Sequence, residues 1–245
     1  MIRAGISTLA LALSLVTMPA FAKDKPEATR AAALTPAEAD AFVARAEKEL
    51  SDFSVVANQA AWINATYITD DTDAIAARIG AQQTELQVKY ALDAAKYAPI
   101  TGLSPDTARK LALLRNGLTL PAPTRAGAAA QLSTIVTRMS SEYGAGKGTL
   151  DGKPINGSDI EAAMGTVRDP AKLQEMWTSW HDNVGAQMRG DYQRSVAIAN
   201  EGAVTLGYQD VGALWRSGYD MSPAEFAKMT DTLWKQVEPL YQSLH

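Results

Sequence analysis

Apolar side chains recur along most of the chain at spacings of three, four and seven residues, which is the repeat of one face of an α-helix. The clearest stripes run from Ile75 to Tyr97, from Leu173 to Met188 and from Phe226 to Leu244. No convincing alternation of apolar and polar residues, the pattern of a half-buried strand, accompanies them. The pattern therefore predicts an all-α fold.

Four helix starts are visible as an N-cap residue followed by proline, at Thr35-Pro36, Ser104-Pro105, Asp169-Pro170 and Ser222-Pro223. Proline suits the first helical position because its missing N–H would be unpaired there. In the first and last cases a glutamate three residues after the cap completes a capping box. With helix stops at Asn116-Gly117 and Leu206-Gly207, these signals predict helices over about 36–61, 71–97, 105–116, 124–142, 158–166, 170–205, 209–217 and 223–244.

Residues 144–157 form the one long stretch without helical periodicity, and their Gly, Lys, Asp, Pro and Asn content predicts an exposed loop. The loop begins with Gly-Ala-Gly-Lys-Gly-Thr, which matches the end of a nucleotide-binding phosphate loop. Such a loop needs a strand before it and a helix after it. Here a helical pattern precedes the stretch, and a turn at Asp151-Gly152 follows. A flexible surface loop is the preferred interpretation.

The N-terminus has the three parts of a secretory signal peptide: Arg3, an apolar run, and the cleavage site Ala20-Phe21-Ala22. We therefore expect a signal peptide at 1–22, a tether at 23–34 and one domain at 35–245. Cleavage after Ala22 predicts a periplasmic or secreted protein. No later stretch reaches the ~20 apolar residues of a membrane span, so none is expected in the mature protein.

The chain has no cysteine, so neither a disulfide nor a lipidated N-terminal cysteine is available to it. Together with the signal peptide, this composition favours a bacterial periplasm. The formal net charge is −4, and Lys and Arg form no cluster. Nucleic acid is therefore excluded as an expected partner.

Residues for catalysis or metal binding are scarce. His181 and His245 are the only histidines, and neither lies in the His-Glu-x-x-His motif that supplies zinc ligands in metallopeptidases. No Gly-x-Ser-x-Gly motif is present. We assign no catalytic residue and no metal ligand, and we interpret His181 as a solvated or core-edge imidazole. The five tryptophans are interpreted as core anchors: Trp62, Trp177, Trp180, Trp215 and Trp234.

Four stretches carry a family resemblance: Trp-Arg-Ser-x-Tyr-Asp at 215–220, Pro-Leu-Tyr-x-x-Leu-His at 239–245, Trp-x-x-Trp at 177–180 and Trp-x-x-x-Thr-x-Ile-Thr at 62–69. Together they resemble the angiotensin-converting enzyme family of zinc peptidyl-dipeptidases (peptidyl-dipeptidase A). The resemblance implies N-terminal lid helices over a deep cleft, followed by part of the cleft wall.

For an intact member, the resemblance implies removal of C-terminal dipeptides from peptides, with zinc and chloride as cofactors. The family's zinc motif lies further downstream than His245, so this chain is expected to be the N-terminal portion of a bacterial member. Its expected partners are a peptide substrate and the missing C-terminal part of the same domain. Alone, it should not cleave peptides.

The resemblance also assigns individual positions. Tyr219 falls on the tyrosine that donates to a buried chloride ion in the family, whose arginine partner comes from the missing part. A second chloride site of animal members uses an arginine where this chain has His181, so that site is not carried over. An acidic residue that binds the substrate's C-terminal side chain in animal members falls at Gly157, which puts substrate preference in doubt.

A different class of function remains open, namely a stand-alone periplasmic helical binding or adaptor module without catalysis. The two interpretations differ in what they predict for the surface. A fragment exposes the apolar face that its partner covers, whereas a complete module does not. The stripe ending at Leu240, Tyr241 and Leu244 favours the fragment.

Overall fold

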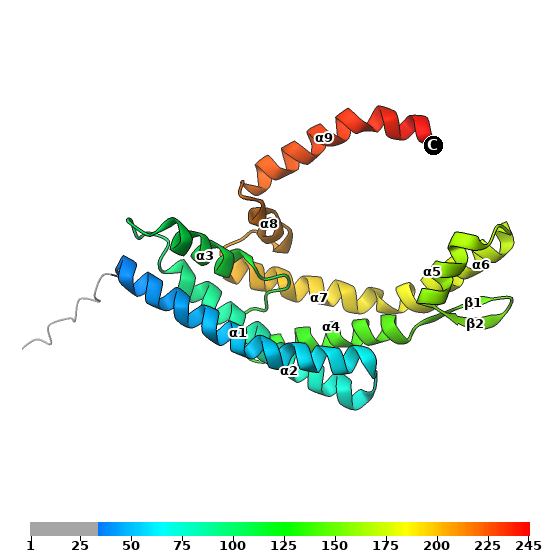
Figure 1. Cartoon of the computed structure of the whole chain (residues 1–245), viewed down its shortest axis with the longest axis horizontal. Helices are drawn as coiled ribbons and strands as arrows, with labels where there is room; N and C mark the ends of the chain where they lie inside the picture. The colour runs from blue at the N-terminus through cyan, green and yellow to red at the C-terminus, as the bar shows by residue number, and fades with distance from the viewer. Residues whose placement is uncertain (1–33) are drawn as a thin grey trace, which may run out of the picture. The chain divides into compact units, whose positions relative to one another are not determined.

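The computed structural model describes residues 34–245, and this part of the chain is built almost entirely of helices (Figure 1). The predicted all-α fold is confirmed. The predicted signal peptide at 1–22 lies outside the described residues, as does the predicted tether apart from Leu34. The elements are α1 (Pro36–Thr66), α2 (Asp70–Ala95), α3 (Pro105–Asn116), α4 (Ala128–Ala145), β1 (Lys147–Leu150), β2 (Lys153–Asn156), α5 (Gly157–Thr166), α6 (Pro170–Trp180), η1 (His181–Gly185), α7 (Ala186–Thr205), α8 (Val211–Arg216), η2 (Ser217–Tyr219) and α9 (Pro223–Leu244).

The predicted helix caps are present. Thr35 and Ser222 each accept a hydrogen bond from the amide three residues later, and Glu38 and Glu225 complete the two capping boxes. Ser104 and the Asp169 carboxylate likewise cap α3 and α6. These caps accept hydrogen bonds from amides that have no partner within their helix. Each of these helices therefore begins directly after its capping residue.

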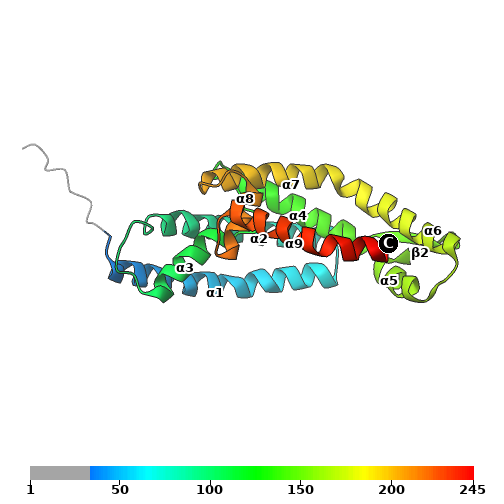
Figure 2. The same cartoon turned by 90° about the horizontal axis from the view of Figure 1, so that it is seen from above.

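Helix α2 is the centre of the fold, because all three clusters of buried apolar side chains include it. It packs between α1 and α4, and Figure 2 shows α1 along one side of the bundle and α7 along the other. The first cluster joins α2 to α1 and α3, the second joins it to α4 and α7, and the third joins it to α7 and α8. Their largest members are Phe42, Tyr90, Tyr97 and Leu111 in the first, Leu132, Ile135 and Ile198 in the second, and Val88, Val211 and Leu214 in the third.

Two local features hold this bundle closely together. A Cβ atom at Gly202 of α7 would lie 2.2 Å from the carbonyl oxygen of Pro121, so only glycine permits this approach. At the other end, the Asp73 carboxylate accepts hydrogen bonds from Asn64 Nδ2 and from Ser141 Oγ, both at 2.6 Å. This cluster ties the end of α1 and the start of α2 to α4.

The predicted loop at 144–157 is wrong, because most of it is an antiparallel hairpin. β1 and β2 pair with Gly148 opposite Ile155. The turn residues Asp151 and Gly152 have φ angles of 51° and 69°, the left-handed conformation that a two-residue hairpin turn requires. The stretch follows α4 and runs into the hairpin, so it lacks the strand before and the helix after that a phosphate loop needs. Gly148 is buried, whereas most of the other hairpin residues are exposed. Strands of four residues are too short to show an alternating pattern, and Asp-Gly was the signal of the hairpin.

The predicted helix 170–205 is continuous but irregular. α6 leads into the π-helical turn η1 and then α7, with helical backbone angles at both junctions. The prediction that the tryptophans are core anchors is wrong. Trp62 is 71% exposed, Trp177, Trp215 and Trp234 are also exposed, and Trp180 is half-buried. Four of the five side chains are thus exposed in the described chain.

Helix α9 forms as predicted, but none of its residues is buried. It packs against α8 and then extends away from it, as Figure 1 shows. Pro239 lies inside the helix and removes one backbone hydrogen bond there. Apart from Phe226, which stacks on Tyr219, the apolar stripe of α9 is therefore uncovered within residues 34–245.

Candidate functional site

The segment at 215–220 connects α8 to α9 and is fastened to the bundle. Trp215 Nε1 donates a hydrogen bond of 2.6 Å to the carbonyl oxygen of Thr119, although its ring remains exposed. Asp220 adopts a left-handed backbone conformation and pairs with Arg109 of α3. The position where α9 begins is therefore set by contacts with α3 and with the segment before α4.

Tyr219, the predicted chloride-binding residue, lies at the end of this segment. Its side chain is 58% exposed, and its ring stacks on Phe226 with the ring centroids 4.2 Å apart. Its hydroxyl makes no hydrogen bond to the described residues and is free to donate. The Nε atom of the neighbouring Arg216 is buried and also lacks a hydrogen-bond partner in this part of the chain.

A cavity of about 750 Å³ opens between the hairpin end, α5 and α6. Its aromatic walls come from Tyr143, Trp177 and Trp180, with His181 at the edge. Tyr143 meets Trp180 edge-on at 5.5 Å, and His181 stacks on Trp177 at 4.0 Å. Sequence analysis missed this cavity, although the Trp-x-x-Trp spacing and the Asp-Gly turn were its signals.

Gly157 lies under one of these rings. A Cβ atom at this position would be 2.8 Å from the Trp180 ring. The acidic side chain that the family resemblance places here would therefore require Trp180 to move. With the Trp180 ring in its present place, only glycine fits at position 157.

The hairpin is held to α6 by polar contacts. The amides of Asp151 and Gly152 each donate a hydrogen bond of 3.0 Å to the Glu175 carboxylate. The Gly152 amide, helped by the Thr149 hydroxyl, holds the pKa of Glu175 below its ordinary value. Lys172 pairs with Asp151 at 2.8 Å. These contacts fix the hairpin turn to α6, the helix whose Trp177 and Trp180 line the cavity.

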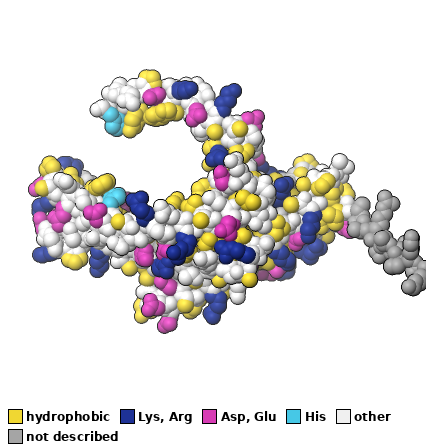
Figure 3. All heavy atoms as spheres, turned by 180° about the vertical axis from the view of Figure 1, so that it is seen from behind, with side chains coloured by type: hydrophobic (Ala, Val, Ile, Leu, Met, Phe, Trp, Pro, Cys, Tyr) yellow, Lys and Arg dark blue, Asp and Glu magenta, His cyan; other side chains and the backbone are white. Residues whose placement is uncertain are grey.

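The two histidines are not brought together. His181 Nδ1 lies 2.7 Å from the carbonyl oxygen of Trp177, and His245 Nδ1 lies 3.1 Å from that of Tyr241. Figure 3 shows the two imidazoles on separate parts of the surface. His181 is exposed, as predicted. Within residues 34–245, no group of three or more His, Cys, Asp or Glu side chains is placed to hold a metal ion.

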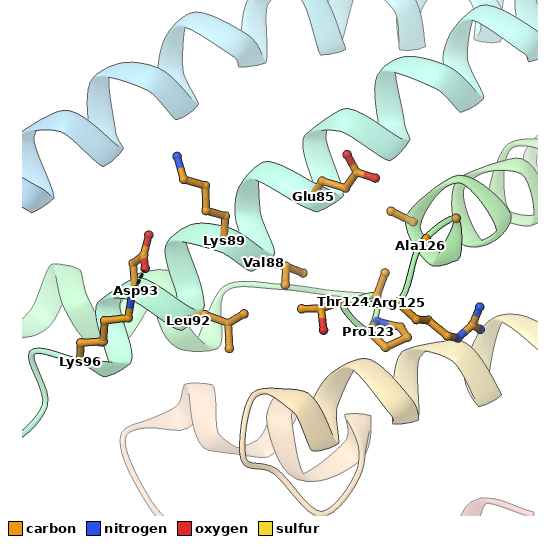
Figure 4. Close-up of a pocket in the computed structure, with 13 residues that line it drawn as sticks. Glu85, Val88, Lys89, Leu92, Asp93, Lys96, Pro123, Thr124, Arg125 and Ala126 are labelled. Carbon is orange, nitrogen blue, oxygen red and sulfur yellow. Dashed lines mark hydrogen bonds and ion pairs between the residues drawn. The ribbon is translucent and has the colours of Figure 1, made fainter. Parts of the chain in front are cut away.

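Another cavity, of about 560 Å³, lies between α2 and the segment before α4 (Figure 4). Val88 and Leu92 point toward Pro123 and Thr124, whereas Lys89 and Glu85 point away from that segment. Of the other charged groups, Lys96 pairs with Asp93 at 2.6 Å and Arg125 pairs with Glu201 at 3.0 Å. The cavity is therefore apolar at its floor, and it brings no pair of catalytic groups together.

None of the described helices is both long enough and apolar enough to pass through a bilayer.

Comparison with known proteins connects these features to a family. The family model described as angiotensin-converting enzyme matches residues 34–245. The angiotensin-converting enzyme-like protein Ace3 of Mus musculus is 29% identical over 189 residues, which cover 76% of this chain and 25% of the mouse protein. The angiotensin-converting enzyme of Rattus norvegicus is 35% identical over 119 residues, or 47% of this chain and 9% of the rat protein.

A third relative extends the match along the chain. The angiotensin-converting enzyme of Haematobia irritans exigua is 25% identical over 215 residues, which cover 83% of this chain and 34% of the fly protein. The matched part of this chain thus corresponds to between about a tenth and a third of each of these relatives.

Proposed function

Because the chain belongs to the angiotensin-converting enzyme family of peptidases, we propose that it forms one part of a domain that releases C-terminal dipeptides from peptides. The observation that carries this proposal is the family match over the whole of residues 34–245. In this proposal the helices α1 and α2 belong to a lid, and the later helices form part of the wall of a substrate cleft. The peptide substrate is the expected small partner.

The described residues do not fit the zinc ion on which the family depends. A catalytic zinc site needs three protein ligands and one open position. No cluster of this kind exists in residues 34–245, and the chain has two histidines, no cysteine and no His-Glu-x-x-His motif. We therefore propose that the zinc-binding part of the domain is supplied from outside these 245 residues, and we assign no catalytic step to the described side chains.

The exposed stripe of α9 supports this proposal over a stand-alone binding or adaptor module. Leu240 and Leu244 are among the most exposed large apolar side chains of the described chain. A complete module would cover such a stripe, because exposed apolar surface of this extent promotes association. The remaining part of the peptidase domain is the proposed cover.

Tyr219 is proposed to contribute to a chloride site that is completed by a cation from the remaining part. Its exposed hydroxyl can donate to an anion, since it has no acceptor among the described residues. In a polypeptide that contains the zinc motif, Tyr219→Phe should weaken the activation by chloride and leave the helical content unchanged. Equal chloride activation in both proteins would exclude this role.

Export is proposed on the signal-peptide pattern. N-terminal sequencing of the protein from a bacterial periplasm should begin at Lys23. A protein that retains Met1 would contradict the proposal.

The main test compares two polypeptides. The 245-residue chain, assayed on a blocked tripeptide with added zinc and chloride, should show no turnover and should not retain one zinc ion per chain. DNA sequence beyond codon 245 should encode a continuation with His-Glu-x-x-His, and the joined polypeptide should cleave the tripeptide until a chelator is added.

Two results would contradict the proposal. Chelator-sensitive turnover by the 245 residues alone would mean that the catalytic groups lie within this chain. A joined polypeptide that binds zinc but releases no dipeptide would mean that the domain is not a peptidase.

A further inference from the structure

Helix α9 carries an uncovered apolar stripe with a defined width. The stripe consists of Phe226, Met229, Leu233, Trp234, Val237, Leu240, Tyr241 and Leu244, and no residue of α9 is buried. At 3.6 residues per turn these positions fall within less than half of the helix circumference. Among the aromatic pairs, Phe226 stacks on Tyr219 before the helix and Tyr241 stacks on the C-terminal His245, so none of these contacts joins the stripe to another helix.

Beyond Phe226, the stripe faces the remainder of the described chain and stays exposed. Figure 3 shows hydrophobic side chains gathered along the inner side of α9, with charged groups on its other side. Within α9, Trp234 and Tyr241 make an edge-on contact at 5.5 Å. The stripe is therefore ordered by its own helix and open to an incoming element.

The charges of α9 are not distributed evenly around this stripe. Asp231 lies three residues before Trp234, and Glu238 lies three residues before Tyr241, so both carboxylates border the stripe on the same edge. Lys228 and Lys235 lie farther round the helix, behind these carboxylates. None of these four side chains forms an ion pair within residues 34–245, where the salt bridges involve other elements.

The other edge of the stripe has no Lys or Arg. Glu225 and Gln236 lie there, and Glu225 is occupied by the helix cap, where it accepts hydrogen bonds from Ser222. An element that covers the stripe thus meets carboxylates along one edge and no Lys or Arg along the other.

We propose that α9 is a docking surface for an amphipathic helix with Lys or Arg residues along the edges of its own apolar stripe, and that this helix belongs to the remaining part of the peptidase domain. The identity of the domain rests on the proposed function above, whereas the charge requirement rests on α9 alone. Lys or Arg at the edge would pair with Asp231 and Glu238, in the way that edge charges select partners in helix pairs.

The same charges disfavour two other occupants. A second copy of the chain would place Asp231 and Glu238 against the same carboxylates or against the edge with Glu225 and Gln236, and no cation would meet them. A bilayer with anionic lipids attracts helices that carry Lys and Arg beside the stripe, whereas this helix presents carboxylates there.

The test uses the 245-residue chain and two labelled helical peptides of about 20 residues. Both peptides have the same Leu and Ala stripe; one has Lys along its edges and the other has Glu. Fluorescence anisotropy at low salt should show binding of the Lys peptide about tenfold tighter than binding of the Glu peptide, with the difference reduced at high salt. Asp231→Lys/Glu238→Lys should reverse the preference.

Glu85→Lys/Asp182→Lys is the matched control, because it changes the net charge by the same amount at exposed positions outside α9. It should keep the preference for the Lys peptide. Equal affinity for the two peptides, or reversal by the control variant, would overturn the proposal.

Sedimentation velocity and vesicle cosedimentation give the remaining outcomes. A dimer that Leu233→Ser abolishes would assign the stripe to a second copy of the chain. Binding to vesicles of phosphatidylcholine and phosphatidylglycerol that the same variant abolishes would assign it to a lipid surface. Either result would overturn the proposal and leave the test of peptidase activity unaffected.

Discussion

Helices α2 and α9 are alike in sequence pattern and opposite in environment. Both begin at a capping box and both carry an apolar stripe. α2 contributes to all three buried clusters, whereas α9 buries none of its residues. An amphipathic pattern thus predicts the helix and the apolar face that packs against another element. It does not predict whether that element lies in the same chain.

The difference has an energetic consequence. Helices in proteins owe most of their stability to packing of the apolar face rather than to intrinsic propensity. α2 therefore should unfold only with the whole bundle, whereas α9 should open locally at a much lower free energy. A change inside the bundle should therefore cost more stability than a matched change on α9 or on the surface.

The largest expected contrast is between two leucines. Leu214 is fully buried in the cluster of α2, α7 and α8, whereas Leu240 of α9 is 65% exposed. Leu214→Ala should lower the free energy of unfolding by about 3 kcal/mol, because it removes buried apolar surface and leaves a cavity. Leu240→Ala should change it by less than about 0.5 kcal/mol. Urea denaturation followed by circular dichroism measures both, and equal losses would show that α9 is packed.

A polar contrast of intermediate size involves Asp73 and Asp71. Asp73 accepts the hydrogen bonds of Asn64 and Ser141, and Asp71 is exposed in the first turn of the same helix. Asp73→Ala should cost about 2 kcal/mol, because two donors lose their acceptor. Asp71→Ala should lower the free energy of unfolding by only about a few tenths of a kcal/mol, because it removes one favourable charge near the start of the helix dipole. Thermal unfolding of both variants tests this, and a loss for Asp71→Ala as large as that for Asp73→Ala would contradict it.

The sequence predicted the helices well and the surface less well. Caps such as Thr35 and Ser222 act within four residues, so their helices could be located without tertiary information. Trp62 and Trp177 were expected in the core because large aromatic side chains usually contribute to it. Their exposure depends on which neighbours the chain supplies, and no local pattern records that.

The candidate site, too, could be predicted only in part from the sequence. Tyr219 could be selected from a motif, and the structure adds its exposure and its stacking on Phe226. The cavity beside Gly157 was missed, because it needs the hairpin, α5 and α6 together. The four-residue strands gave no periodic signal, and only the Asp151-Gly152 turn indicated them.

A smaller contrast compares the same cap in the two regions. Thr35→Ala removes the cap of α1, whose first turns are packed in the bundle, and should lower the free energy of global unfolding by about 1 kcal/mol. Ser222→Ala removes the cap of α9 and should leave global unfolding unchanged. Amide hydrogen exchange should instead become faster in the first turns of α9. An equal loss of global stability in both variants, or unchanged amide exchange in α9, would contradict the distinction.

The smallest expected effect is a pH dependence at the start of α9. The Glu225 carboxylate accepts hydrogen bonds from the Ser222 hydroxyl at 2.6 Å and from the Ser222 amide at 2.9 Å. Both hydrogen bonds hold the pKa of Glu225 below its ordinary value of 4.5, and the bond from the Ser222 hydroxyl has the larger effect. Since the pKa is lower in the folded state, the stabilisation is present above the ordinary pKa and is lost as the pH falls through the lowered pKa.

The Ser222 amide resonance should therefore shift in this acidic range while the bundle stays folded. Glu225→Gln keeps an acceptor at this position and has no proton to gain, so the shift should vanish in that variant. A Ser222 amide that titrates equally in the Gln variant would show that another group controls the start of α9.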